Sequence, residues 1–234
     1  MAVADDSSIV PSIDDLDGQR RRPNMEGSTV TAFTDDVTIQ DKQDVHDSLL
    51  LARLAAAKKF DVEERPRDWY KEFLKVLVNV GWRIKHKQFQ EILQHSSRLP
   101  FKDFVSNTTY ESASENEKKV IKKSLDDALS SAKKVEKFED SISDGNKGHL
   151  EVGVATRQST VGLTLLVNGY YFSMKPQPLH HDRRRSFRMQ VNVSEMNLYV
   201  STTQLQLNET VYGQVRQDIR EKLETRKSKK SEKK

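Results

Sequence analysis

The sequence predicts an α+β protein: a helical half of about four helices, then a mostly antiparallel sheet of four to six strands, then a C-terminal helix. Three observations predict it. Apolar residues recur at helical spacing over 43–142, alternate with other residues over 149–207, and return to a four-residue period over 209–225. Runs of helices followed by runs of strands are typical of α+β chains. We therefore expect one domain over 43–225 with disordered ends.

The first 42 residues are predicted to form a disordered, acidic arm. Residues 1–47 contain eleven Asp and Glu residues against four Lys and Arg residues, and Asp, Ser and Thr are frequent. The arm shows no sustained period of 3.6 or 2, and a segment of this composition buries too little apolar surface to fold alone. Short apolar clusters at Ile9–Val10 and 30–33 are candidates for docking on the domain or on another protein.

The helical half is predicted to contain three main helices, over 44–60, 68–80 and 115–139. Each has apolar residues near one face and a high content of helix formers, although the valines at 76–80 leave a strand alternative open for the second. Shorter helical pieces are expected around 89–93 and 101–105. Because the piece at 101–105 is only a turn or two long, we expect about four helices in this half.

The aromatic residues of the second helix are predicted to anchor the core. Trp69 and Tyr70 begin an apolar stripe that ends at Gly81, a residue that favours helix termination, and Trp82 follows directly. We expect the chain to turn at Gly81, with Trp69 and Trp82 as core anchors.

The β half is predicted from alternation over 150–154, 161–167, 187–193 and 197–207. Asn168–Gly169 lies between two apolar runs, and Asn-Gly is a strong signal for a two-residue hairpin turn. We therefore expect a hairpin that turns at these two residues. An alternative, in which this hairpin inserts into a membrane, is disfavoured because the apolar run is too short for a membrane-spanning strand.

The C-terminal helix is predicted from Val211, Val215, Ile219 and Leu223, which recur every four residues. Residues 226–234 follow as a basic tail without an apolar anchor. Residues 214–234 contain nine Lys and Arg residues against four Asp and Glu residues, which indicates either a solubilising end or a contact for phosphate, anionic lipid or an acidic partner.

One loop concentrates the polar residues that are candidates for binding. It follows Pro176 and Pro178, and its arginines favour an anion or an acidic partner over a metal ion, with a plain solvated loop as the alternative. Two lysines of the tail complete the candidate site. The predicted binding residues are His180, His181, Arg183, Arg184, Arg185, Arg188, Lys229 and Lys230.

Neither a metal nor a cofactor is expected. The chain has no cysteine, which excludes thiolate nucleophiles and Cys-ligated metals, and its histidines form no recognised ligand motif. Residues 140–151 match part of a calcium loop, but Ile142 occupies a ligand position and a strand follows instead of a helix. The sequence shows no nucleotide-binding or hydrolase motif, secretory signal or membrane span, so we expect a soluble protein of unassigned compartment.

These observations predict a non-enzymatic interaction protein that acts by binding a protein partner or an anionic membrane surface. The helix-plus-hairpin organisation suggests a toxin-like or secretion-associated component, with oligomer formation left open. Two alternatives remain: a binder of nucleic acid or anionic lipid through the basic tail and arginine loop, and an enzyme that uses dispersed carboxylates with His180 or His181.

Overall fold

The computed structural model describes residues 29–92, 99–128, 143–144, 147–174 and 193–231. These residues form five α-helices, one short 3-10 helix and a six-stranded sheet. The α+β class predicted from the sequence is confirmed.

The sheet has the strand order β1-β4-β5-β6-β2, with the two-residue strand β3 paired to β4. Neighbouring strands are antiparallel except β1 and β4, which are parallel. The strands are β1 (Thr29–Phe33), β2 (Trp82–Ile92), β3 (Ser143–Asp144), β4 (Lys147–Gln158), β5 (Gly162–Met174) and β6 (Met196–Leu207). The mostly antiparallel sheet is thus as predicted.

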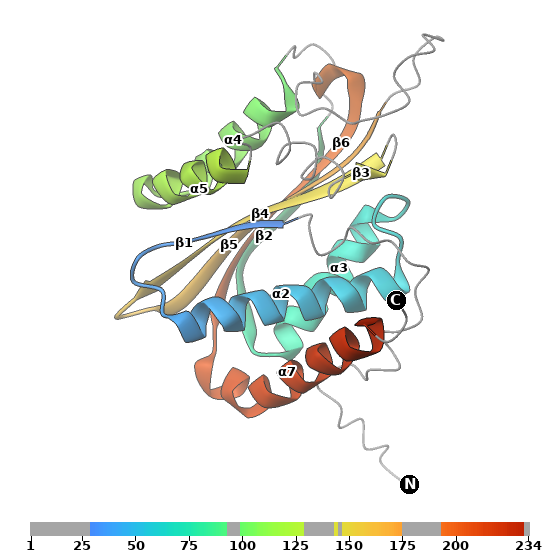
Figure 1. The fold of residues 1–234 in the computed structure, drawn as a ribbon. Helices are drawn as coiled ribbons and strands as arrows, with labels where there is room; N and C mark the ends of the chain where they lie inside the picture. Colours follow the sequence, from blue (N-terminus) through green and yellow to red (C-terminus); the bar gives the residue numbers. More distant parts are fainter. Residues whose placement is uncertain (1–28, 93–98, 129–142, 145–146, 175–192, 232–234) are drawn as a thin grey trace, which may run out of the picture.

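Helices cover both faces of this sheet, so the fold has three layers (Figure 1). On one face lie α2 (Ile39–Lys59), α3 (Pro66–Asn79) and α7 (Glu209–Ser231), and on the other lie α4 (Phe101–Glu111) and α5 (Glu115–Ala128). The 3-10 helix η1 (Val193–Glu195) leads into β6.

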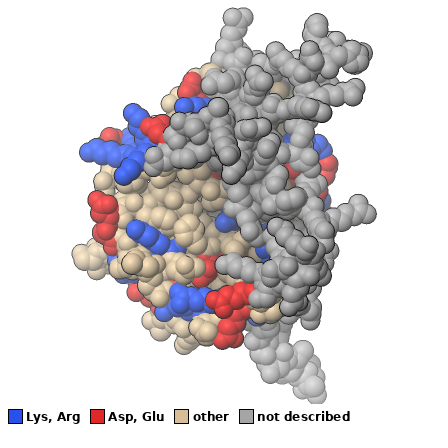
Figure 2. Space-filling view, viewed as in Figure 1, with Lys and Arg blue, Asp and Glu red and all other residues tan. Residues whose placement is uncertain are grey.

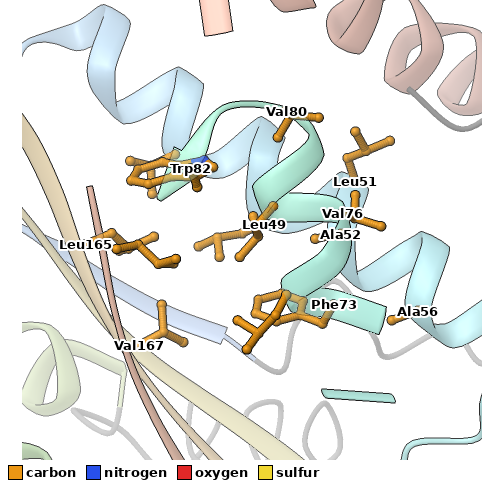
Figure 3. Packing of buried hydrophobic residues seen from close by; sticks show 14 of the residues in the cluster. Leu49, Leu51, Ala52, Ala56, Phe73, Val76, Val80, Trp82, Leu165 and Val167 are labelled. Carbon is orange, nitrogen blue, oxygen red and sulfur yellow. The ribbon is translucent and has the colours of Figure 1, made fainter. Parts of the chain in front are cut away.

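Side chains of β5 point alternately to the two faces of the sheet, so this strand contributes to both hydrophobic cores. Leu163, Leu165 and Val167 pack under α2 and α3, whereas Leu166 and Tyr170 face the α4 and α5 layer. Figure 3 shows the first core, where side chains of α2 and α3 meet those of β5 beside Trp82. Trp82 and Trp69 are fully buried, as expected of the two anchors.

The predicted helices over 44–60 and 68–80 correspond to α2 and α3. Helix α2 starts earlier, at Ile39, because Thr38 and Asp41 form a capping box in which each side chain bonds the backbone N–H of the other residue. The third predicted helix corresponds to α5, which the structure describes as far as Ala128. Residues 129–142 lie outside the described part of the chain.

The predicted short helix around 89–93 is wrong, because residues 82–92 form strand β2. Trp82 and Ile84 alternate with exposed Arg83 along this strand, and ten of its residues pair with β6. A register shift between Ile84 and His86 interrupts the two-residue period, so the apolar residues of the second half look more helical in the sequence. The helical half is therefore divided by a strand.

The predicted turn at Asn168–Gly169 is also wrong, since both residues lie in the middle of β5. Asn168 is 0% exposed and accepts a hydrogen bond from Thr202 Oγ1 at 2.8 Å. Gly169 lies where an added Cβ would be 2.6 Å from Ser201 Oγ. The glycine therefore leaves room for the side chains of Ser201 and Tyr171, and the β4–β5 hairpin turns at 159–161 instead.

The predicted boundary of the arm at residue 42 is placed too late. Strand β1 and the start of α2 lie inside 1–42, and Thr29–Phe33 pairs with residues 151–155 of β4. A five-residue strand at a sheet edge is too short to show a period. Residues 1–28 lie outside the described part of the chain, as do 187–192 of a predicted strand.

The C-terminal helix is confirmed and is longer than predicted, since α7 continues to Ser231 through most of the basic tail. Its apolar residues Tyr212, Val215, Ile219 and Leu223 are buried against the first core. The predicted helix end at 225 relied on the loss of apolar residues, but Lys and Arg are good helix formers without apolar neighbours.

Candidate functional site

The predicted binding loop lies outside the part of the chain that the structure describes. His180, His181, Arg183, Arg184, Arg185 and Arg188 lie outside the described residues. Lys229 and Lys230 lie on the described backbone of α7, and their side chains are not described. The following groups of polar residues were not predicted from the sequence.

A buried charged cluster lies between β4 and α2. The two-residue period of β4 directs His149 and Glu151 towards the α2 and α3 layer, where Arg53 Nε of α2 lies 3.5 Å from Glu151 Oε2. Thr29 Oγ1 of β1 donates to the same oxygen at 3.2 Å. Glu151 is 1% exposed, and burial raises the pKa of its carboxyl group although Arg53 opposes the rise.

His149 is enclosed by aromatic rings beside this carboxylate. Its ring stacks on Tyr171 at 4.8 Å and meets Trp69 edge to face at 4.9 Å between centroids. Burial, with the nearby charge of Arg53, lowers the pKa of His149 to about 3. The imidazole is therefore neutral at pH 7, and its enclosure keeps it from a substrate. We assign this cluster to packing between the helices and the sheet.

A second cluster joins α2 to α7. Asp44 is 1% exposed, and Arg216 and Arg220 of α7 both donate to its carboxylate. Tyr212 Oη donates to the backbone carbonyl of Asp44 at 3.1 Å. These contacts position the C-terminal helix across α2, so they too are structural.

Exposed cations gather at the outer edge of the sheet. Strand β2 pairs with β6 on one side, and no described strand pairs with its other side. Helix α3 turns into β2 at Gly81, and the Arg67 guanidinium lies 5.2 Å from the Phe89 ring centroid. The C-terminal half of α3 therefore runs beside the first half of β2. We call this surface the basic edge; it comprises Lys71, Lys75, Lys85 and Lys87, with Arg83 on the opposite face of β2 from α3, and all five are exposed.

The basic edge is poorly neutralised by the described acids. Lys71 lies 3.8 Å from Asp68, and this is the one ion pair that a basic-edge residue makes within the described part of the chain. The register shift of β2 places Lys85 outside the regular pairing. By contrast, the face in Figure 2 shows blue and red residues interspersed around a broad tan area.

No group of three His, Asp or Glu residues among the described residues is arranged to hold a metal ion. No helix in the described ranges combines the length and apolar character needed to cross a membrane.

Comparison with solved structures shows distant similarities, among them the following two. The chain resembles a solved delta-endotoxin structure at 11% identity and a TM-score of 0.47, covering 85% of this chain and 84% of the other. It resembles a structure of the Evf virulence factor at 12% identity and a TM-score of 0.39, covering 90% of this chain and 88% of the other. Similarities at these TM-scores carry no argument about function. No family model and no curated protein sequence matches the chain.

Proposed function

We propose that this chain is a non-enzymatic binding protein that attaches to an acidic protein surface through the basic edge. The observation that carries the proposal is the group of five exposed cations on α3 and β2, beside a strand edge that no described strand pairs. Exposed charges of one sign attract an oppositely charged partner and accelerate its association.

The buried clusters support binding over catalysis. A general acid or base must reach a proton of the substrate, whereas His149 and Glu151 are covered by α2 and α3, and Asp44 is covered by α7. The described titratable groups that converge are thus those that hold the layers together.

The lysines of β2 have a further role that is compatible with binding. Lysines and bulges at an exposed edge strand prevent pairing with uncharged strands of other chains. An acidic partner is the one kind of protein that these lysines attract. The edge therefore selects a partner by charge.

The arginine loop and the basic tail stay predictions as additional contacts, since their side chains lie outside the described residues. The toxin-like or secretion-associated role also stays a prediction from the sequence. Binding of nucleic acid or anionic lipid by the basic edge becomes an outcome of the test below.

The test compares two triple variants of equal charge change. Lys75, Lys85 and Lys87 are replaced by Gln in one, and Lys119, Lys122 and Lys123, which are exposed on α5 in the opposite layer, are replaced in the control. We expect the first variant to lose about tenfold in affinity for poly-glutamate at about 50 mM salt. The control variant should stay within about twofold of the wild type.

Equal losses in both variants, or no detectable binding of poly-glutamate by the wild type, would overturn the proposal. Tighter, basic-edge-dependent binding of single-stranded DNA or of vesicles containing phosphatidylserine would also contradict it, since it would assign the surface to phosphate groups. Circular dichroism of each variant verifies that the fold is unchanged.

A further inference from the structure

We infer that the acidic surface bound by the basic edge belongs to a second copy of this chain. This inference rests on the proposed function and names its partner. The second surface, which we call the acidic end, lies where the β4–β5 hairpin, the start of α2 and the start of α7 meet. It comprises Asp35, Asp36, Glu209, Ile39 and Val161.

Arg157 of β4 holds the acidic end together. Its backbone N–H donates to Asp36 Oδ2 at 3.0 Å, and its guanidinium lies 3.0 Å from Glu209 Oε1. The same guanidinium makes two hydrogen bonds to Asp41, and these contacts with three acids fix the hairpin against the starts of both helices. Asp35, Asp36 and Glu209 remain exposed, so this end of the molecule presents negative charge on a rigid support.

Exposed apolar side chains support the pairing of these two surfaces. Ile39 is 88% exposed, Val78 is 46% exposed and Val161 is 38% exposed, and these are the large exposed hydrophobic residues of the described part of the chain. Ile39 and Val161 lie on the acidic end. Val78 lies on α3 one helical turn after Lys75, beside the basic edge. Each charged surface therefore offers apolar area that contact with the other would bury.

The position of the surfaces favours contact between copies over contact within one. The acidic end caps the hairpin that joins β4 to β5, whereas the basic edge runs along the outside of β2, with β6 in between. Arg83 lies opposite Gln206, whose side chain donates to the carbonyl of Val161, so the two surfaces adjoin at that point. Among the described residues, however, no ion pair joins a basic-edge cation to Asp35, Asp36 or Glu209 within one copy. When the acidic end of one copy occupies the basic edge of the next, the contact joins unlike surfaces in head-to-tail fashion.

The experiment measures mass by sedimentation velocity over about 5–200 μM protein at about 50 mM salt. One variant reverses the basic edge by replacing Lys75, Lys85 and Lys87 with Glu. The other alters the acidic end by Asp35→Lys and Ile39→Lys, at side chains that are exposed. A control variant replaces Lys119, Lys122 and Lys123 of α5 with Glu.

We expect the mass of the wild type and of the control to rise with concentration, and each surface variant alone to stay monomeric. An equimolar mixture of the two surface variants should regain association, because each variant retains the surface that the other lacks. This restoration also shows that both variants are folded. About 500 mM salt should shift the wild type towards monomer.

A wild type that stays monomeric throughout, a mixture that does not associate, or a control that dissociates would each overturn the inference. The proposed function is tested separately. A monomeric wild type that still binds poly-glutamate through the basic edge removes the second copy as the partner and leaves the proposed function standing. Binding of poly-glutamate that is not weakened by the basic-edge substitutions contradicts the proposed function, whether or not the chain associates with itself.

Discussion

Arg216 donates from Nη2 to Asp44 Oδ2 at 2.8 Å and from Nε to Oδ1 at 3.0 Å, which joins the last helix to α2 across 172 positions of sequence. Arg220 adds a further bond to the same carboxylate at 3.4 Å. One buried acid on α2 thus receives two cations from α7. These bonds connect the first helix of the domain to its last helix.

Replacing Asp44 with Ala should therefore lower the free energy of unfolding by about 2–4 kcal/mol. The substitution removes a buried acceptor from two guanidinium groups that are only about a third exposed and are partly fixed by neighbouring contacts. Urea denaturation followed by circular dichroism measures the loss. Asp218→Ala, at an exposed acid of α7, is the control and should change stability by less than about 0.5 kcal/mol. Similar losses of unfolding free energy for both variants would contradict a stabilising role of the contact between Asp44 and α7.

Glu151 and Arg53 should show strong coupling in a double-mutant cycle. Glu151→Leu alone takes the carboxylate from a buried guanidinium and should cost about 3–5 kcal/mol. The double variant Arg53→Leu with Glu151→Leu removes both charges and should lie within about 2 kcal/mol of the wild type. Denaturation curves of the four proteins measure the coupling. Additive losses would show that the two side chains act independently.

His149 should make stability depend on pH. Its pKa is about 3 in the folded protein against the ordinary 6.5, so between these values the unfolded chain binds a proton that the folded chain does not. The free energy of unfolding should accordingly fall as the pH is lowered from about 6.5 towards 3, by several kcal/mol in total. The raised pKa of Glu151 acts in the opposite direction.

Comparison of the wild type with His149→Phe isolates the histidine, because Glu151 and Arg53 are present in both. The variant keeps an aromatic ring against Tyr171 and lacks the titrating group. We expect its stability to fall less than that of the wild type below pH 6.5. Identical pH profiles would show that His149 is accessible to protons in the folded state.

Replacing two different glycines with alanine should change the stability of the protein in opposite directions. Gly169→Ala should destabilise by about 1–3 kcal/mol, because the new methyl group would lie 2.6 Å from Ser201 Oγ. Gly213→Ala should stabilise by about 0.5–1 kcal/mol, since a Cβ added to this helical glycine would meet no atom of the rest of the protein within 4 Å. Thermal melts of both variants measure the difference. A neutral Gly169→Ala would show that the side chains of Ser201 and Tyr171 can move aside at little cost.

The period of the apolar residues predicts much of this fold, and its failures have local physical causes. Trp69 and Trp82 are recognisable as anchors because Trp69 begins the apolar stripe of a helix and Trp82 directly follows the glycine after the end of that helix. Asn168 and Gly169 resemble a turn only when the neighbouring strand is ignored. Thr202 and Ser201 of β6 make the same two residues suitable for a strand interior, and no local pattern contains that information.

The candidate site was less accessible to sequence reasoning. Lys85 and Lys87 alternate with other polar residues on β2, and that alternation could have indicated an exposed edge strand. The convergence of Asp36 and Glu209 around Arg157 joins three distant segments and leaves no local signal. Charge clusters of this kind depend on tertiary contacts alone.

The parallel pairing of β1 with β4 has a kinetic consequence. Thr29 and Glu151 are hydrogen bonded across 122 positions of sequence, whereas β4, β5 and β6 follow one another as antiparallel neighbours. Closing a long loop loses chain entropy before the contacts that stabilise it have formed. The three neighbouring strands should therefore assemble early, and β1 should join them late. The same order in reverse should make β1 the first strand of the sheet to detach.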